Sequence, residues 1–236
     1  KDLASGDSVY TSRLSVKSQP WLSDHVIYGT VVVPGATYAA MALAAAGPPG
    51  RVQDVFFYEP IILSEKASRE VQLTLHPLED GAGWSFRVHS RPYGVSDAEW
   101  SLNADGTVVN GAAPVEEEPA SDAAEPIDTA TERMERMRPQ QLFETFADME
   151  LAWGPNWSGS LKSLWLGEGE AIGDVTVGEE LAEHLGTEPM HPVLLDLCTG
   201  VAFPAFPALL AAEAGVNDLF LPLRYGQVEL LEKMPR

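Results

Sequence analysis

The chain is poor in positive charge. Of its 236 residues, 15 are Lys or Arg and 35 are Asp or Glu, so the formal net charge at pH 7 is 15 − 35 = −20. This imbalance excludes most nucleic-acid-binding proteins, because these need a cationic surface to displace the counterions of the phosphates. We therefore expect no nucleic-acid partner.

Cysteine and long apolar runs are also scarce. Cys198 is the only cysteine, so no internal disulfide can form, and a single thiol indicates a reducing compartment. The longest apolar stretches, Val31–Ala46 and Val201–Ala212, contain proline and are shorter than the roughly 20 residues that span a bilayer. The chain starts at Lys1 without an initiator Met or an apolar signal core. We expect a cytoplasmic segment of a longer polypeptide, with no membrane partner.

The remaining composition is that of a globular protein, with 45% hydrophobic and 21% charged residues. At about 150 residues per domain, the length predicts one large domain or two small ones. Clustered acids, small residues and three prolines between positions 113 and 131 cannot build a packed face. We predict an N-terminal unit over residues 1–112, an acidic Pro-rich linker over 113–131 and a C-terminal unit over 132–236.

Each predicted unit combines a helix with strands. In the first, residues 36–46 are strong helix formers without charge, opened by Pro34 and closed by Gly47–Gly50, which predicts a buried helix. Turn signals stand at Gly81–Gly83 and at Asp105-Gly106. The predicted strands around this helix are 52–58, 71–76, 84–90 and 99–109. One apolar helix among antiparallel strands is an α+β pattern.

The second unit repeats this organisation without a residue-level repeat. We predict an amphipathic helix over 131–149 and an apolar helical segment over 194–212, which Pro204 and Pro207 should kink or break. The predicted strands are 159–165, 170–177 and 220–231.

The first candidate for chemistry is His25. It precedes Gly29 by four residues and Pro34-Gly35 by nine, and this Pro-Gly opens the buried helix. The backbone N–H groups of a first helical turn are unpaired and can polarise a carbonyl group. A base beside such a donor can remove a proton α to a carbonyl. The alternative is an ordinary loop histidine.

The second candidate is Asp196, the only acid between Glu188 and Glu213. A carboxyl group in an apolar run tends to have a raised pKa, so it can serve as a proton donor. The alternatives are a helix N-cap or a buried structural acid paired with a backbone N–H.

These two segments, with their order and spacing, resemble the dehydratase domain of modular polyketide synthases. The first motif of that family, His-x-x-x-Gly-x-x-x-x-Pro, is matched by His25, Gly29 and Pro34. The second, His-Pro-x-x-Leu followed by Asp-x-x-x-Gln/His, is matched by His191, Pro192, Leu195 and Asp196. The third, Gly-Tyr-x-Tyr-Gly-Pro-x-Phe, is partly matched by Trp153, Gly154, Pro155 and Trp157, and the fourth, Leu-Pro-Phe-x-Trp, falls on residues 221–225.

The resemblance implies an α+β double hotdog, in which two sheets each wrap around a helix, with one hotdog in each predicted unit. It implies loss of water from a β-hydroxyacyl thioester held on the phosphopantetheine arm of an acyl carrier protein, without a metal or a cofactor of its own. His25 would take the α proton, Asp196 would protonate the departing hydroxyl, and the Gly35 N–H would polarise the thioester carbonyl. The residues implied to bind substrate are Gly29, Pro34, Gly35, Trp153, Pro155 and Thr199. The implied partners are the carrier protein, neighbouring synthase domains and a second copy in a homodimer.

The sequence departs from the family pattern near the predicted acid. Gly200 stands where the family has Gln or His, and Glu150-Leu151 and Trp153 replace Gly-Tyr and the second Tyr of the third motif. A glycine cannot orient the acid through a side chain, and an indole N–H donates but cannot accept. Two alternatives follow: an enoyl double-bond isomerase on the same fold, or a catalytically silent binding or structural domain. Shift-type relatives tend to lose the motif Asp or Pro, so Asp196 and Pro34 favour dehydration.

Overall fold

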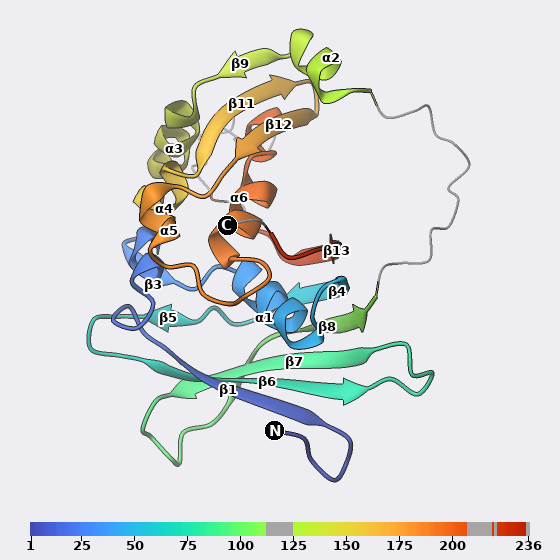
Figure 1. Ribbon diagram of the computed structural model, residues 1–236. Coiled ribbons are helices and arrows are strands. Elements are labelled where there is room, and N and C mark those ends of the chain that lie inside the picture. The colour runs from blue at the N-terminus through green and yellow to red at the C-terminus, as the bar shows by residue number, and fades with distance from the viewer. Residues whose placement is uncertain (112–124, 207–218, 220, 235–236) are drawn as a thin grey trace.

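The computed structural model describes residues 1–111, 125–206, 219 and 221–234 (Figure 1). The fold is an α+β double hotdog of antiparallel sheets, with one central helix, α1 (Ala36–Ala46), in the first half and another, α6 (Pro192–Gly200), in the second. Most of the predicted linker, residues 113–124, lies outside the described residues. No helix in the described ranges is long and apolar enough to cross a membrane.

The first half is built on a six-stranded antiparallel sheet. Its order is β1 (Ser8–Leu14), β6 (Arg69–Pro77), β7 (Trp84–Pro92), β8 (Ser101–Asn110), β4 (Gly50–Phe57) and β13 (Arg224–Leu230). In β6, every second side chain is buried, namely Val71, Leu73 and Leu75. This period of two puts one face of the sheet against the core, where α1 packs on β4 and β8.

The buried helix α1 has the predicted bounds. Its sequence has no charge, and seven of its residues are buried. Its C-cap is Gly47, whose φ of 81° lies in the left-handed region that glycine adopts at little steric cost. Figure 1 shows α1 between the six-stranded sheet and α6, and the two helices are in contact.

One predicted turn in this sheet is wrong and one is confirmed. Asp105-Gly106 lies within β8, where Gly106 is opposite Phe86 of β7. A Cβ at Gly106 would lie 3.0 Å from the Phe86 ring and from the Gln53 carbonyl oxygen. The glycine therefore leaves room for an aromatic ring inside the sheet. The other signal, around Gly81, does connect β6 to β7 as an antiparallel pair.

The remaining strands form two smaller antiparallel sheets. One has the order β10 (Leu151–Trp153), β2 (His25–Ile27), β3 (Thr30–Val32) and β5 (Ile62–Leu63), and the other has the order β12 (Glu170–Val175), β11 (Leu161–Gly167) and β9 (Glu135–Met137). The short helices are η1 (Pro20–Asp24), α2 (Ile127–Glu132), α4 (Pro155–Ser158), α5 (Glu179–Ala182) and η2 (Phe203–Ala205).

The predicted amphipathic helix over 131–149 is shorter than expected. Helix α3 spans Pro139–Asp148, and the preceding residues form α2 and strand β9. Pro139 occupies the start of α3, where its missing N–H needs no partner, and proline disfavours a helical conformation in the residue before it. The proline therefore separates a strand from a helix within one amphipathic pattern.

The break predicted in the apolar segment after residue 194 is confirmed for its described part. Helix α6 ends at Gly200, and the single 3-10 turn η2 contains Pro204. Residues 207–212 of this prediction lie outside the described residues.

Two strands from the second half of the chain join sheets of the first half. Strand β10 pairs with β2, and β13 near the C-terminus pairs with β4. The two halves are therefore connected by backbone hydrogen bonds as well as by the contact between α1 and α6.

Candidate active site

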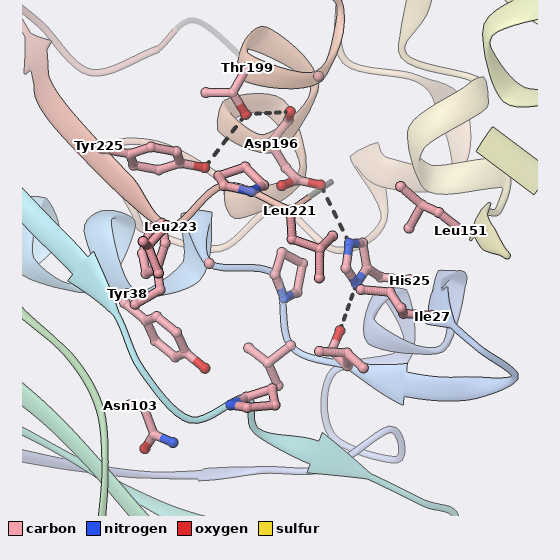
Figure 2. A pocket seen from close by; sticks show the side chains of 18 of the residues that line it. His25, Ile27, Tyr38, Asn103, Leu151, Asp196, Thr199, Leu221, Leu223 and Tyr225 are labelled. Atoms are coloured by element: carbon pink, nitrogen blue, oxygen red, sulfur yellow. Dashed lines mark hydrogen bonds and ion pairs between the residues drawn. The ribbon is translucent and has the colours of Figure 1, made fainter. Parts of the chain in front are cut away.

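A cavity of about 290 Å³ lies where the two halves meet, and both predicted catalytic residues line it (Figure 2). His25 comes from β2 in the first half and Asp196 from α6 in the second. Most of the other lining side chains are apolar or aromatic, including Ile27, Leu151 and Phe203. An apolar cavity with a few convergent polar groups is the usual form of a small-molecule site.

The His25 imidazole is held in one orientation by the backbone. It starts β2, only 6% of the residue is exposed, and its Nδ1 lies 2.7 Å from the carbonyl oxygen of Val32. A carbonyl oxygen can only accept, so this contact assigns the proton to Nδ1 and leaves Nε2 with a free lone pair. His25 is therefore a buried strand residue with an available base, and the alternative of an ordinary loop histidine is wrong.

Asp196 faces that free nitrogen. Its Oδ2 lies 3.8 Å from His25 Nε2, and 13% of its side chain is exposed, so the carboxyl group is mostly buried but reaches the cavity. Burial raises the pKa of Asp196, while the nearby His25 and a hydrogen bond from Trp157 act in the opposite direction. A carboxyl group with a raised pKa can hold a proton to donate.

The two alternative roles for Asp196, a helix N-cap and a structural acid paired with a backbone N–H, do not fit its position. It lies in the middle of α6, and the N-cap of this helix is His191, whose Nδ1 accepts a hydrogen bond from the Val193 N–H. The side chain of Asp196 accepts from an indole, Nε1 of Trp157 at 2.9 Å, instead of from a backbone N–H.

The start of α1 supplies backbone donors at the cavity. The Thr37 and Tyr38 N–H groups bond to the carbonyls of Pro34 and Gly35, whereas the N–H groups of Gly35 and Ala36 have no hydrogen-bond partner within the described part of the chain. Gly35 lines the cavity, and a Cβ there would lie 3.1 Å from the Phe57 ring. Glycine at this position thus accommodates the Phe57 ring beside the unpaired N–H groups of the first helical turn.

Three further predicted substrate-binding residues also line the cavity: Pro34, Trp153 and Thr199. The Thr199 hydroxyl donates to the backbone carbonyl of Asp196 at 2.9 Å and lies 3.5 Å from the Tyr225 hydroxyl (Figure 2). Its side chain is thus occupied by the helix and does not bond to the carboxyl group of Asp196.

The structure does not place the other two predicted substrate-binding residues, Gly29 and Pro155, on the cavity wall. Gly29 has a φ of 71° in the turn between β2 and β3, which is a conformation that favours glycine. Pro155 is the first residue of α4, where its fixed φ suits a helix start. Both residues shape the backbone beside the site.

Tyr38 and Asn103 carry no catalytic signal in the sequence, and they are far apart in the chain but line the same cavity. Tyr225 also lines this cavity, and it stands at the last position of the fourth motif. Asn103 Oδ1 is buried and has no hydrogen-bond partner among the described residues. Trp157 belongs to the partly matched third motif, and only that motif could have drawn attention to it. None of these contacts follows from local sequence patterns.

Within the described ranges, no group of three or more His, Cys, Asp or Glu side chains lies close enough together to hold a metal ion.

Two family models match the chain. One, described as the polyketide synthase dehydratase domain, matches residues 1–91, and the other, described as the polyketide synthase dehydratase N-terminal domain, matches residues 121–236.

Curated relatives include much longer proteins. The chain is 35% identical over 199 residues to polyketide synthase GfsB of Streptomyces halstedii. The matched region covers 83% of this chain and 3% of that protein. It is 29% identical over 210 residues to the pikromycin polyketide synthase component PikAII of Streptomyces venezuelae. That matched region covers 85% of this chain and 5% of the relative. The chain therefore spans only a small part of the length of these relatives.

Solved structures share the fold over the whole chain. The dehydratase domain from the CurH module of curacin polyketide synthase has a TM-score of 0.85 and 30% identity, covering 100% of this chain and 79% of that one. The dehydratase domain from the CurK module has a TM-score of 0.82, with 100% and 82% coverage, and its 21% identity supports the fold alone.

Proposed function

The chain belongs to the polyketide synthase dehydratase family, and we propose that it removes water from a β-hydroxyacyl thioester to give the α,β-enoyl thioester. The acyl group would be carried on the phosphopantetheine arm of an acyl carrier protein within a modular synthase. Members of this family are in general hydro-lyases. The observation that carries the proposal is the separation of 3.8 Å between His25 Nε2 and Asp196 Oδ2 at one cavity.

In the proposed reaction His25 acts as the base. Its Nε2 takes the α proton, and the electrons of that C–H bond become the new α,β double bond as the β-carbon–oxygen bond breaks. The free N–H of Gly35 polarises the thioester carbonyl, which stabilises the negative charge that develops on its oxygen. The contact between Nδ1 and the Val32 carbonyl keeps the base in the required tautomer.

Asp196 acts as the acid in the same reaction. Its carboxyl proton passes to the departing β-hydroxyl, so the leaving group is water and not hydroxide. The cycle leaves His25 protonated and Asp196 ionised, and return of the proton from His25 to Asp196 restores the starting state. Each step uses a group of this chain, so the proposed reaction needs no metal or cofactor of its own. The partners we propose are the carrier protein, the adjoining synthase domains and a second copy of the chain.

The test is turnover of a synthetic β-hydroxyacyl pantetheine thioester by the purified chain, followed by mass spectrometry. We expect His25→Ala and Asp196→Ala each to lower kcat by at least about 100-fold, which is the scale of one general acid or base step. His76→Ala is the matched control, because His76 is an exposed imidazole paired with Asp7 away from the cavity. Full activity in both site variants, with circular dichroism unchanged, would disprove the assignment.

The same assay separates the two other functions that the sequence allows. An isomerase would convert an α,β-enoyl thioester to its β,γ isomer without hydrating it, whereas a dehydratase would form the β-hydroxyacyl thioester in the reverse direction. A silent domain would turn over neither substrate.

A further inference from the structure

We propose that Trp157 is the positioning residue of Asp196, and that Trp153 and Gly200 are a matched pair that allows an indole to take this role. The catalytic part of this inference rests on the proposed function. The hydrogen bond itself and the fit of the two residues can be tested without it.

Trp157 is the side chain that holds the acid. Its Nε1–H donates to Asp196 Oδ2 at 2.9 Å, and this is the same oxygen that lies 3.8 Å from His25 Nε2. No other hydrogen bond to the Asp196 carboxyl group is found among the residues that the structure describes. The indole therefore fixes which oxygen faces the base, and the second oxygen, Oδ1, remains available for the transferable proton.

The indole is itself held rigidly. Trp157 is fully buried, and its ring contacts those of Trp21, His25 and Trp153, with centroids 6.2, 5.5 and 6.3 Å away. Rings packed on several sides keep the N–H direction fixed, because rotation of the indole would need its neighbours to move. A fixed donor can orient a carboxyl group, whereas a mobile one cannot.

The backbone that carries Trp157 is tied to the base. Asp24, which directly precedes His25, accepts hydrogen bonds at Oδ2 from the backbone N–H and side-chain Nδ2 of Asn156, at 2.9 and 2.7 Å. The Asp24 carbonyl accepts from the Gly154 N–H at 2.8 Å. One short segment therefore positions both the imidazole and the indole that holds the acid.

Gly200 explains why the donor is on α4 and not on α6. Gly200 is one helical turn after Asp196, so a side chain there would lie on the same face of α6 as the acid. A Cβ at Gly200 would clash with Cη2 of the Trp153 indole. The ring of Trp153 thus occupies the space that a side chain at this position needs, and it stacks on Trp157 with an interplanar angle of 22°.

A hydrogen bond from an indole N–H favours the ionised form of a carboxyl group. An indole N–H cannot accept, so it bonds more strongly to the ionised carboxylate than to the acid. The titratable groups that interact with Asp196 are His25 of β2 and Tyr225 of β13. Helices α1 and α4, which pack on α6, carry no charged residue, and on β12 Glu170 is paired with an arginine while Asp174 is exposed. Loss of the indole N–H should therefore raise the pKa of Asp196.

The first test compares two variants at Trp157. Trp157→Phe removes the N–H and part of the ring, and replacement by benzothienylalanine keeps the bicyclic shape but substitutes sulfur for N–H. We expect both to lower kcat by about 10- to 100-fold with KM within about twofold, which is the scale of one hydrogen bond to a charged group. The alkaline limb of the kcat pH profile should move to higher pH in both. Trp165→Phe is the control, since Trp165 lies on β11 outside the cavity.

The second test reads the hydrogen bond directly. The Trp157 indole N–H resonance, assigned by its absence in Trp157→Phe, should move downfield in the wild-type protein as the pH is raised and Asp196 ionises. Asp196→Asn keeps an acceptor oxygen but does not titrate, so this movement should disappear, whereas it should persist in His25→Ala.

The two tests separate the two proposals. If the wild-type protein shows no turnover but the resonance behaves as described, the proposed function fails and the positioning inference stands. If the wild-type protein turns over and both Trp157 variants match it in kcat and pH profile, Trp157 does not position the acid. A Trp157 resonance that moves identically in Asp196→Asn would overturn the hydrogen bond itself.

Discussion

At the scale of single residues, the proposed use of Asp196 as an acid opposes the stability of the fold. Burial raises the pKa of its carboxyl group, so between the ordinary carboxyl pKa and this raised value the folded state binds more protons than the unfolded state. The free energy of unfolding therefore falls as the pH rises through that interval and stays reduced above it. An uncharged isostere should relieve this loss.

We predict that Asp196→Asn is more stable than the wild-type protein and that its advantage grows with pH. The difference in Tm should rise as the pH is raised above the ordinary carboxyl pKa and reach about 2–4 °C, a typical gain when a destabilising active-site group is removed from a domain of this size. Thermal unfolding across this pH range measures it, with the exposed Glu144→Gln as control. A difference that is the same at every pH would contradict the prediction.

How far the site follows from the sequence also differs by residue. The motif spacing identifies His25 and Asp196, because a motif records residue types at fixed separations. It could not show that the Val32 carbonyl sets the tautomer of His25, or that Trp157 and not a residue at position 200 bonds to the acid. These partners depend on where strands and helices pack, which local patterns do not encode.

At the scale of elements, helix α6 begins with an unusual cap. His191 caps α6 by accepting the Val193 N–H at Nδ1, so the cap exists only while that nitrogen is unprotonated. Burial lowers the pKa of His191 to about 4. The neighbouring Glu188 acts to raise this pKa and His184 acts to lower it. The folded state therefore binds fewer protons than the unfolded state between about pH 4 and the ordinary histidine pKa, and stability is lost as the pH falls through that range.

We predict that this cap makes the protein sensitive to acid. Acidification from about pH 7 to about pH 4 should lower the free energy of unfolding by roughly 3 kcal/mol through His191. His191→Asn keeps a capping side chain that does not titrate, so most of this pH dependence should vanish. Urea unfolding at several pH values tests it, with His76→Ala as the control for an exposed histidine. An unchanged pH dependence in His191→Asn would exclude His191 as its source.

The contact between α6 and β10 predicts a second effect on stability. Gly200→Ala places a Cβ against the Trp153 ring, and we expect a loss of about 1–3 kcal/mol from overpacking. In the double variant with Trp153→Leu the added methyl group should be tolerated, so the two changes should not be additive. Gly226→Ala is the matched control, since a Cβ there meets no atom within 4 Å. Equal losses at Gly200 and Gly226 in urea unfolding would contradict the matched fit.

The elements that the sequence predicted are those with a strong local pattern. The bounds of α1 and the alternation in β6 follow from composition and from a period of two. The strands beside the site, β2, β3, β5 and β10, have two or three residues each, which is too short for a period to be recognised. Their pairing is set by contacts between distant segments, such as β10 of the second half with β2.

At the scale of the whole molecule, the candidate active site depends on both halves. The proposed base, His25, lies on β2 and the proposed acid, Asp196, lies on α6, while β10 and β13 of the second half pair with strands of the first. Neither half alone contains both proposed catalytic residues. The predicted division at 113–131 therefore separates the two halves along the sequence, whereas the candidate site needs residues from both halves.

The net charge of −20 bears on how such a site receives its substrate. Acyl carrier proteins, the proposed partners, are typically acidic, so two acidic surfaces should repel each other over a distance that salt shortens. A carrier attached to the same polypeptide has an effective concentration that can reach the millimolar range and so needs little affinity. We infer that the domain depends on covalent tethering for delivery.

This inference predicts weak and salt-dependent recognition of a free carrier. The Kd of the isolated domain for a free acyl carrier protein should exceed about 100 μM in physiological salt, since a tethered partner at about millimolar effective concentration is still captured at that affinity. Raising the salt from about 20 to about 200 mM should lower KM for the carrier-bound substrate, because screening weakens the repulsion. KM for the same acyl group on pantetheine alone should not change. Calorimetry and steady-state kinetics measure both quantities, and a low-micromolar Kd at physiological salt would show that affinity, and not tethering, brings the carrier to this domain.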